Sequence, residues 1–144
     1  YQVFDKALFR FAYRHAELPP GAIVVEAVLK GTSKDTAEIQ KEMDRIVQER
    51  EDSQPLRTRT GGSTFKNPPG KKAWELIDMA GCRGLTLGGA KVSEKHCNFL
   101  LNTGDATAAD LEDLGEMVKG RVREHFGVEL EWEIRRLGER EMRA

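Results

Sequence analysis

The residues of this chain best suited to chemistry lie in one short segment, residues 61–68, which reads GGSTFKNP. Its glycines let the backbone approach a ligand closely, Ser63 adds a hydroxyl, and Lys66 and Asn67 add a cation and an amide suited to phosphate or sugar oxygens. The spacing is not that of a phosphate-binding P-loop, and prolines follow where that motif needs a helix. The segment is therefore a candidate binding loop of another kind, with an ordinary solvent-exposed turn as the alternative.

Two charged residues elsewhere are further candidates. Glu133 lies in residues 128–135, where apolar and charged side chains alternate, so Glu133 and Arg135 would lie side by side on the polar face of a strand. Arg14 follows Tyr13 near the start of the chain. Charged groups in such places are usually solvated surface groups. Spacing alone leaves both the functional and the surface interpretation open.

Metal and disulfide chemistry are not expected. Cys82 and Cys97 are too few for a disulfide scaffold, and the three histidines have no spacing with them that would chelate a metal. His96, next to Cys97, is more typical of a structural histidine than of a ligand. This cysteine usage predicts a reducing, cytoplasmic location.

Composition and charge limit the class of protein. A chain of 144 residues with 39% hydrophobic residues has the size of one globular domain with a modest core. Its charges nearly cancel to a net −1, so neither nucleic acid nor an anionic membrane is expected as the main partner. The most apolar run, residues 22–29, is too short to cross a bilayer. The chain starts at Tyr1 without a methionine, which suggests a fragment or a processed form.

The elements that must position these residues begin with a strand, a helix and a loop. Residues 22–29 are apolar and β-branched between breaker residues, which predicts a buried strand. Residues 33–50 carry apolar side chains at helical spacing and predict an amphipathic helix, with Thr32 and Ser33 available as caps. Residues 51–70 contain three prolines and three glycines and predict a loop with short extended pieces.

A short helix and two strands are expected next. Residues 71–80 have helical character, and Gly81 suits a left-handed end to that helix. Residues 85–92 and 98–102 predict two short strands, the first interrupted by a pair of glycines.

The last part of the chain has the most regular pattern. Thr107 and Asp110 resemble a capping pair, an apolar stripe follows at helical spacing, and Gly127 stops the helix. The alternation over residues 128–135 predicts a half-buried strand. Together these elements predict an α+β fold, with a small mixed or antiparallel sheet packed against two or three helices.

The order of several short motifs resembles one enzyme family. In chain order they are YRH at 13–15, GGSTFKNP at 61–68, AGCRG at 80–84, GGAKVS at 88–93, HCNF at 96–99, NTGD at 102–105 and LEWEIR at 130–135. Each is weak alone. Taken in this order over nearly the whole chain, they resemble the second half of the UDP-N-acetylenolpyruvoylglucosamine reductases, in the shorter form found in many bacteria.

The resemblance implies an FAD- and NADPH-dependent reduction for peptidoglycan synthesis. NADPH reduces the flavin, which then reduces the enolpyruvyl double bond of UDP-N-acetylglucosamine enolpyruvate to give UDP-N-acetylmuramate. By match to the family motifs, Ser63 donates a proton to the second carbon of that bond. Glu133 and Arg14 polarise the enolpyruvyl carboxylate and stabilise the intermediate.

The resemblance also implies substrate-binding residues. Lys66 and Asn67 are expected to hold the UDP-sugar, Arg135 is a further candidate, and Tyr13 is expected to position the substrate beside Arg14.

The resemblance further implies a division of the chain into three parts. Residues 1–31 would be the end of the FAD-binding domain with leftover strands, residues 32–52 a linking helix, and residues 53–144 the substrate-binding domain. The glycine-rich flavin loops of the family lie before the point that Tyr1 represents. The chain is therefore expected to lack the main FAD site, to need the missing flavin domain as its partner, and to be inactive alone.

Two alternatives from other classes stay open at this point. One is a free-standing module that binds a nucleotide-sugar or phosphorylated ligand without redox chemistry. The other is an interaction domain in which the polar clusters are only surface.

Overall fold

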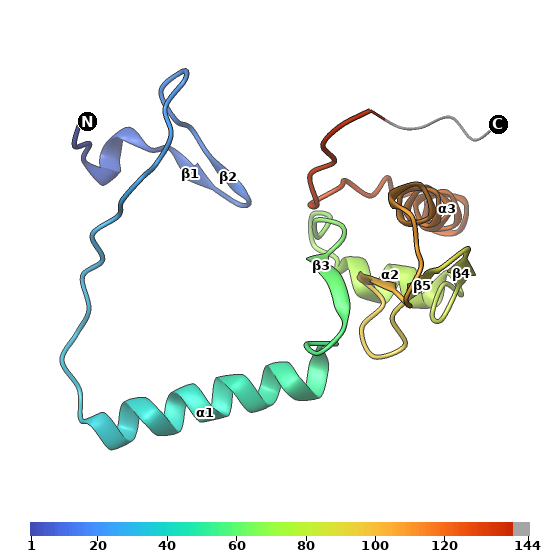
Figure 1. Ribbon diagram of the computed structural model, residues 1–144, viewed down its shortest axis with the longest axis horizontal. Coiled ribbons are helices and arrows are strands. Elements are labelled where there is room, and N and C mark those ends of the chain that lie inside the picture. Colours follow the sequence, from blue (N-terminus) through green and yellow to red (C-terminus); the bar gives the residue numbers. More distant parts are fainter. Residues whose placement is uncertain (140–144) are drawn as a thin grey trace. The chain divides into compact units, whose positions relative to one another are not determined.

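The computed structural model describes residues 1–139 (Figure 1). Contacts between residues divide the chain into two compact units, one from Tyr1 to Ile39 and the other from Gln40 onward. Every buried side chain among the described residues belongs to the second unit. The hydrophobic core of the chain is therefore the core of that unit.

The first unit contains a single helical turn and a hairpin. The 3-10 turn η1 spans Lys6–Leu8. The strands β1 (Phe11–Ala12) and β2 (His15–Ala16) pair antiparallel. Tyr13 and Arg14 form the two-residue turn between these strands, so the hairpin presents this pair at its tip.

Residues 22–29 form no strand, so the prediction of a buried strand is wrong for this structure. Val28 is 92% exposed and Leu29 is 90% exposed. A strand needs a neighbour to satisfy its backbone N–H and C=O groups, and no other part of residues 1–139 pairs with this segment. The β-branched composition indicates what the segment prefers locally, but it cannot supply a partner.

The predicted amphipathic helix is present as α1 (Thr36–Ser53). Its predicted caps, Thr32 and Ser33, are wrong, because Asp35 accepts two first-turn N–H groups at 2.9 and 3.3 Å. Aspartate caps as well as serine does and adds a negative charge at the positive end of the helix dipole. Neither α1 nor another helix within residues 1–139 has the length and apolarity to span a membrane.

Four short strands of the second unit form one antiparallel sheet. They are β3 (Arg59–Ser63), β4 (Thr86–Leu87), β5 (Ala90–Val92) and β6 (Phe99–Asn102), in the order β3-β6-β5-β4. The strands β4 and β5 form a hairpin at the predicted glycine pair, and β3 is an extended piece within the predicted loop. The sheet is antiparallel rather than mixed: short turns join β4 to β5 and β5 to β6, and β3 pairs antiparallel with β6 across the longer connection that contains α2.

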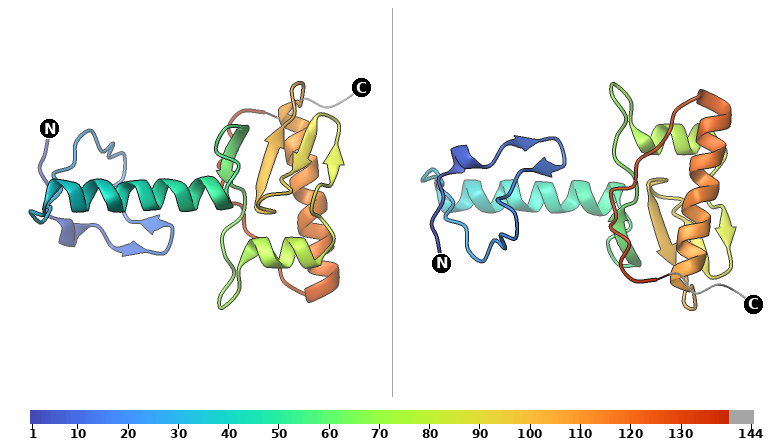
Figure 2. Two further views of the ribbon diagram at one scale, coloured as in Figure 1. Left: turned by 90° about the horizontal axis from the view of Figure 1, so that it is seen from below. Right: turned by 90° about the horizontal axis from the view of Figure 1, so that it is seen from above.

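Besides the part of α1 from Gln40 onward, the second unit contains two helices, α2 (Ala73–Met79) and α3 (Ala108–Phe126). The helix α3 packs across β4, β5 and β6, and α2 packs against α3 (Figure 2). Their apolar side chains form one buried cluster with the sheet, which includes Ile77, Val92, Leu100, Leu114, Val118, Val122 and Leu130. The predicted α+β fold is confirmed.

Both ends of α3 are set by the residues that the sequence indicates. The Thr107 hydroxyl accepts the Asp110 N–H at 3.1 Å, and the Asp110 carboxylate accepts the Thr107 N–H at 2.9 Å. At the other end Gly127 has φ +64°, a left-handed conformation that residues with a side chain rarely adopt. The apolar stripe of α3 is thereby aligned with the sheet.

Residues 128–135 follow the predicted alternation but form no regular strand. Leu130 is buried between the exposed Glu129 and Glu131, as expected. The pairing that the structure records for this segment is one antiparallel bridge, between Trp132 and Phe65. Toward residue 128 the ladder cannot lengthen, because the partner segment continues into two prolines that have no N–H to donate.

Removing the cap of α3 should destabilise the second unit. Thr107→Ala leaves the Asp110 N–H without its acceptor, and we expect the free energy of unfolding to fall by about 1 kcal/mol. Urea denaturation followed by circular dichroism measures this change. Thr86→Ala removes an exposed hydroxyl from β4 and serves as the control, with an expected change below about 0.5 kcal/mol. Equal effects of the two substitutions would show that the cap does not stabilise α3.

Candidate functional site

The candidate loop begins at a bulge in β3. Thr60 pairs with Leu101 and Ser63 pairs with Phe99, so β3 advances by three residues where β6 advances by two. Gly62 adopts φ +89° inside this bulge, a conformation that glycine reaches without strain. The bulge places the partly exposed Ser63 at the end of the strand.

The backbone that follows Ser63 is held on both sides. On one side the Thr64 N–H donates to the Asn98 carbonyl at 2.7 Å. On the other side the Thr64 carbonyl accepts the Glu133 N–H at 2.8 Å. Ser63 and Glu133, which lie far apart in sequence, therefore sit on directly paired backbone segments.

Trp132 anchors the segment that carries Glu133. Its ring centroid lies 4.9 Å from that of Phe65, and its Nε1 donates to the Glu116 carboxylate at 2.8 Å. Gly115 of α3 makes room for this ring, since a Cβ at position 115 would overlap the indole. The tryptophan fixes the segment between the candidate loop and α3.

Glu133 and Arg135 flank a side chain that packs on the bulge. Ile134 Cδ1 would lie 3.1 Å from a Cβ added to Gly61, so the glycine lets the isoleucine sit close to β3. Glu133 is half-buried, whereas Arg135 is exposed. The segment that carries these two charges thus packs on the turn that presents Ser63.

Lys66 and Asn67 both contact other parts of the protein. The Lys66 ammonium lies 3.1 Å from the Glu131 carboxylate, and the Lys66 N–H donates to the Glu131 carbonyl at 2.9 Å. The Asn67 side-chain oxygen accepts the N–H of Ala73, the first residue of α2, at 2.9 Å. An exposed ion pair of this kind contributes about 1 kcal/mol or less, so a ligand anion could replace Glu131 as the partner of Lys66.

Arg14 and Tyr13 belong to the first unit, at the tip of its hairpin. Arg14 has φ +56°, which is uncommon for a residue other than glycine. Its guanidinium carbon lies 5.5 Å from the centroid of the Tyr13 ring, within the range of a cation–π contact. The hairpin therefore presents a cation backed by an aromatic ring.

The two thiols and His96 lie in environments that favour their neutral forms. Burial raises the pKa of the Cys97 thiol to about 11 and also raises the pKa of Cys82. Burial lowers the pKa of His96. Within residues 1–139 there is no group of three His, Cys, Asp or Glu side chains that could hold a metal ion.

Comparison with known proteins identifies the family. Residues 54–137, more than half of the chain, match the family model of the UDP-N-acetylenolpyruvoylglucosamine reductase, C-terminal domain. The chain belongs to the UDP-N-acetylenolpyruvoylglucosamine reductase family.

Curated relatives and a solved structure agree with this assignment. A UDP-N-acetylenolpyruvoylglucosamine reductase of Erythrobacter litoralis is 65% identical over 129 residues, which are 90% of this chain and 40% of the relative. One from Sphingopyxis alaskensis is 64% identical over 91% of this chain and 44% of the relative. The crystal structure of the Thermus caldophilus reductase matches with a TM-score of 0.79 and 39% identity, over 92% of this chain and 47% of that one. The chain thus spans less than half the length of these relatives.

The glycine pairs of this reductase-family chain do not fit a flavin site. Loops that hold a dinucleotide pyrophosphate use glycines to leave backbone N–H groups open to the ligand. Here a side chain at Gly88 or Gly89 would overlap Asp110 or Ala106, and Gly61 is filled by the isoleucine described above. Three of the four glycines in the two pairs therefore serve internal packing, and these turns offer no pyrophosphate cradle.

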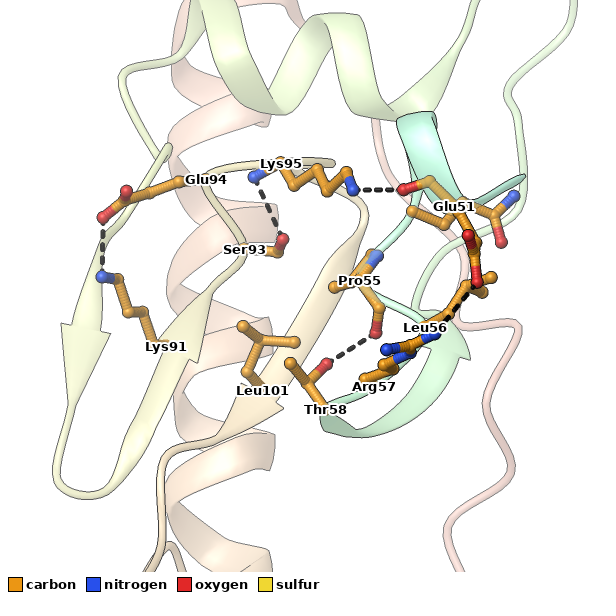
Figure 3. Close-up of a pocket in the computed structure, with 11 residues that line it drawn as sticks. Glu51, Pro55, Leu56, Arg57, Thr58, Lys91, Ser93, Glu94, Lys95 and Leu101 are labelled. Atoms are coloured by element: carbon orange, nitrogen blue, oxygen red, sulfur yellow. Dashed lines mark hydrogen bonds and ion pairs between the residues drawn. The ribbon is translucent and has the colours of Figure 1, made fainter. Parts of the chain in front are cut away.

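A separate pocket of about 590 Å³ lies on the sheet face opposite α3 (Figure 3). Its polar lining includes Arg57, Lys91 and Lys95, and Lys91 pairs with Glu94 at 2.6 Å. Ser63 and the other predicted site residues do not line it. The sequence does not predict this pocket, because its lining comes from several segments that are each ordinary in composition.

Three residues that hold the candidate site together have no role predicted from the sequence. These are Asn98, Gly115 and Trp132. Asn98 lies in the HCNF motif, and Gly115 is a glycine inside a helical pattern, which often marks a close packing contact. Both signals were available in the sequence, but their partners were not.

The packing of the Trp132 ring against α3 can be tested by substitution of Gly115. Gly115→Ala should destabilise the protein by about 1–3 kcal/mol, because the displaced indole outweighs the better helix propensity of alanine. Gly120→Ala is the matched control on the same helix. A Cβ there meets nothing within 4 Å, so we expect a gain of up to about 1 kcal/mol. Urea denaturation compares the two variants, and stabilisation by both would contradict the packing contact.

Proposed function

We propose that this chain forms the substrate-binding and proton-donating part of an FAD- and NADPH-dependent reductase. The enzyme would convert UDP-N-acetylglucosamine enolpyruvate to UDP-N-acetylmuramate for peptidoglycan synthesis in the cytoplasm. One structural observation carries the proposal: the hydrogen bond from the Glu133 N–H to the Thr64 carbonyl, which pairs the segments of Ser63 and Glu133. The family membership and the names of the relatives support it.

Three consecutive parts of the chain would have different roles. Residues 1–31 would complete a flavin domain, residues 32–52 would form the linking helix, and residues 53–144 would form the substrate-binding domain. Because the glycine turns of this chain serve its own packing, FAD would be held by a flavin domain that these residues do not supply. This arrangement agrees with the share of the relatives that the chain covers.

Reduction of the enolpyruvyl double bond adds a hydride to one carbon and a proton to the other. The flavin would supply the hydride, and in our proposal Ser63 supplies the proton. A serine hydroxyl is a poor acid in water, so it can do this only where it is held rigidly at its target in a favourable field. The bulge at Gly62 and the paired backbone after Ser63 support such placement, and the Lys66 cation follows three residues later in the same loop.

Glu133 and Arg14 would act on the enolpyruvyl carboxylate. Negative charge that develops toward this carboxylate needs a cation or a hydrogen-bond donor beside it. Arg14 offers a permanent cation at the hairpin tip, and Glu133 can donate only when it carries a proton.

Lys66, Asn67, Arg135 and Tyr13 would hold the UDP-sugar. Lys66 has an exposed, exchangeable partner, and the exposed Arg135 lies two residues from Glu133. The Asn67 side-chain oxygen already holds the first turn of α2. Asn67 would therefore contribute to the substrate mainly through its amide N–H groups.

The role of Ser63 can be tested in a full-length reductase that carries this sequence as its carboxyl-terminal part. With Ser63→Ala we expect flavin reduction by NADPH to stay normal and flavin reoxidation by the UDP-sugar to slow by about 10²-fold or more. Rapid-mixing absorbance measurements separate the two half-reactions. Thr103→Ala, which removes an exposed hydroxyl near the far end of β6, is the control and should change neither. Normal reoxidation by the Ser63 variant would exclude this serine as the proton donor.

The role of Glu133 can be tested by substrate affinity in the same enzyme. Glu133→Gln keeps a neutral donor and should bind the substrate nearly as well as the unaltered protein. Glu133→Ala should weaken binding by about 1.5–3 kcal/mol, roughly tenfold to a hundredfold in Kd. Isothermal titration calorimetry measures both, with the exposed Glu129→Ala as control. A weak effect of the alanine variant would remove Glu133 from the substrate site.

A further inference from the structure

A buried asparagine holds the backbone directly after Ser63. Asn98 is only 4% exposed. Its side-chain oxygen accepts the Phe65 N–H at 3.0 Å, and its side-chain nitrogen donates to the Phe65 carbonyl at 2.8 Å. The Asn98 backbone carbonyl accepts the Thr64 N–H at 2.7 Å. One residue thus makes three hydrogen bonds to two consecutive residues of the candidate loop.

These contacts are stronger constraints than the same bonds would be at the surface. Thr64 is fully buried and Phe65 is 1% exposed, so water cannot replace a lost partner. A buried backbone N–H or C=O without a partner is unfavourable, and the amide of Asn98 satisfies one of each on Phe65. The backbone of residues 64–65 is therefore confined to one position.

Ser63 needs such a constraint because the residues before it are flexible types. Gly61 and Gly62 allow many backbone conformations, so they cannot by themselves hold the hydroxyl in place. The pairing of β3 with β6 and the residues after Ser63 supply the constraint that the glycines lack. Asn98 also precedes Phe99, the residue that pairs with Ser63 across the sheet. Asn98 therefore constrains the backbone of Ser63 in two ways. It adjoins the strand residue that pairs with Ser63, and it holds the two residues that follow Ser63.

We propose that Asn98 is a positioning residue for the proton transfer, which it serves by fixing the backbone that carries Ser63. The inference rests on the proposed function of Ser63 as the proton donor. Asn98 itself makes no contact with substrate in this proposal. It should therefore affect the step that uses Ser63 and leave the reduction of the flavin by NADPH unaffected.

The chain offers a matched control at the other end of β6. The side-chain oxygen of Asn102 accepts the Gly104 and Ala106 N–H groups at 2.8 and 3.2 Å, and its side-chain nitrogen donates to the Ala106 carbonyl at 3.3 Å. Asn102 is thus another asparagine that clamps a backbone loop. Its loop leads to α3 and contains no residue of the candidate site.

The experiment compares Asn98→Ala with Asn102→Ala in the full-length reductase, with Ser63→Ala as the reference. For Asn98→Ala we expect flavin reduction by NADPH to stay normal and reoxidation by UDP-N-acetylglucosamine enolpyruvate to slow on the order of 10²-fold. Asn102→Ala should leave both half-reactions normal, although both variants lose comparable hydrogen bonds. Amide hydrogen exchange should also become faster at Phe65 in the Asn98 variant only.

If Asn98→Ala does not fold, Asn98→Asp replaces it, because it keeps the shape and the acceptor for the Phe65 N–H and loses the donor to the Phe65 carbonyl. Normal reoxidation in a folded Asn98 variant, or equal slowing by the Asn102 variant, would overturn the inference while leaving the role of Ser63 intact. Normal reoxidation by Ser63→Ala would instead overturn the proposed function, and the role of Asn98 would fail with it.

Discussion

The candidate site depends on one stretch of paired backbone, residues 64–66. It lies between Asn98 on one side and the segment of Glu131 and Glu133 on the other. A single hydrogen bond of this kind contributes only about 0.5–1.5 kcal/mol in net terms. Burial gives the set its importance, because Thr64 and Phe65 have almost no exposed surface and a broken bond cannot be replaced by water. Without this pairing the backbone of residues 131–133 would not be hydrogen-bonded to the loop beside Ser63.

Apolar packing supports the same arrangement from behind. Trp132 sits between Phe65 and the open position at Gly115, so the segment of Glu133 is attached to α3 as well as to the loop. Ile134 performs the corresponding role at the bulge. Glycine is used here for close approach between parts of the protein, which explains why the glycine pairs of this chain do not form a ligand cradle. The polar site residues of the second unit are exposed or half-exposed at the edges of this packed framework; they are Ser63, Lys66, Asn67, Glu133 and Arg135.

The two units of the chain differ in burial: the second unit has a core of its own, whereas none of the side chains of the first unit is buried. The second unit has a sheet, two packed helices and one buried core. The first unit has a short hairpin and a run of exposed apolar residues at 22–29. Arg14 lies in this first unit, in a left-handed conformation at the hairpin turn. Two-residue hairpin turns place residues at positive φ, so this conformation belongs to the turn that presents the Arg14 cation.

The sequence by itself determined the elements whose causes are local. The ends of α3 follow from Thr107, Asp110 and Gly127, and the hairpin of β4 and β5 follows from a glycine pair, because caps and turns depend on neighbours only a few residues away. The motifs also identified the family and the candidate residues. Only the tertiary structure decided the rest. Residues 22–29 and 128–135 have the composition of strands, but pairing requires a partner from elsewhere in the chain. The first segment has none within residues 1–139, and prolines limit the pairing of the second at one end. The hydrogen bonds of Asn98 and the packing of Trp132 on Phe65 and Gly115 join residues far apart in sequence, so no local sequence pattern could predict these contacts.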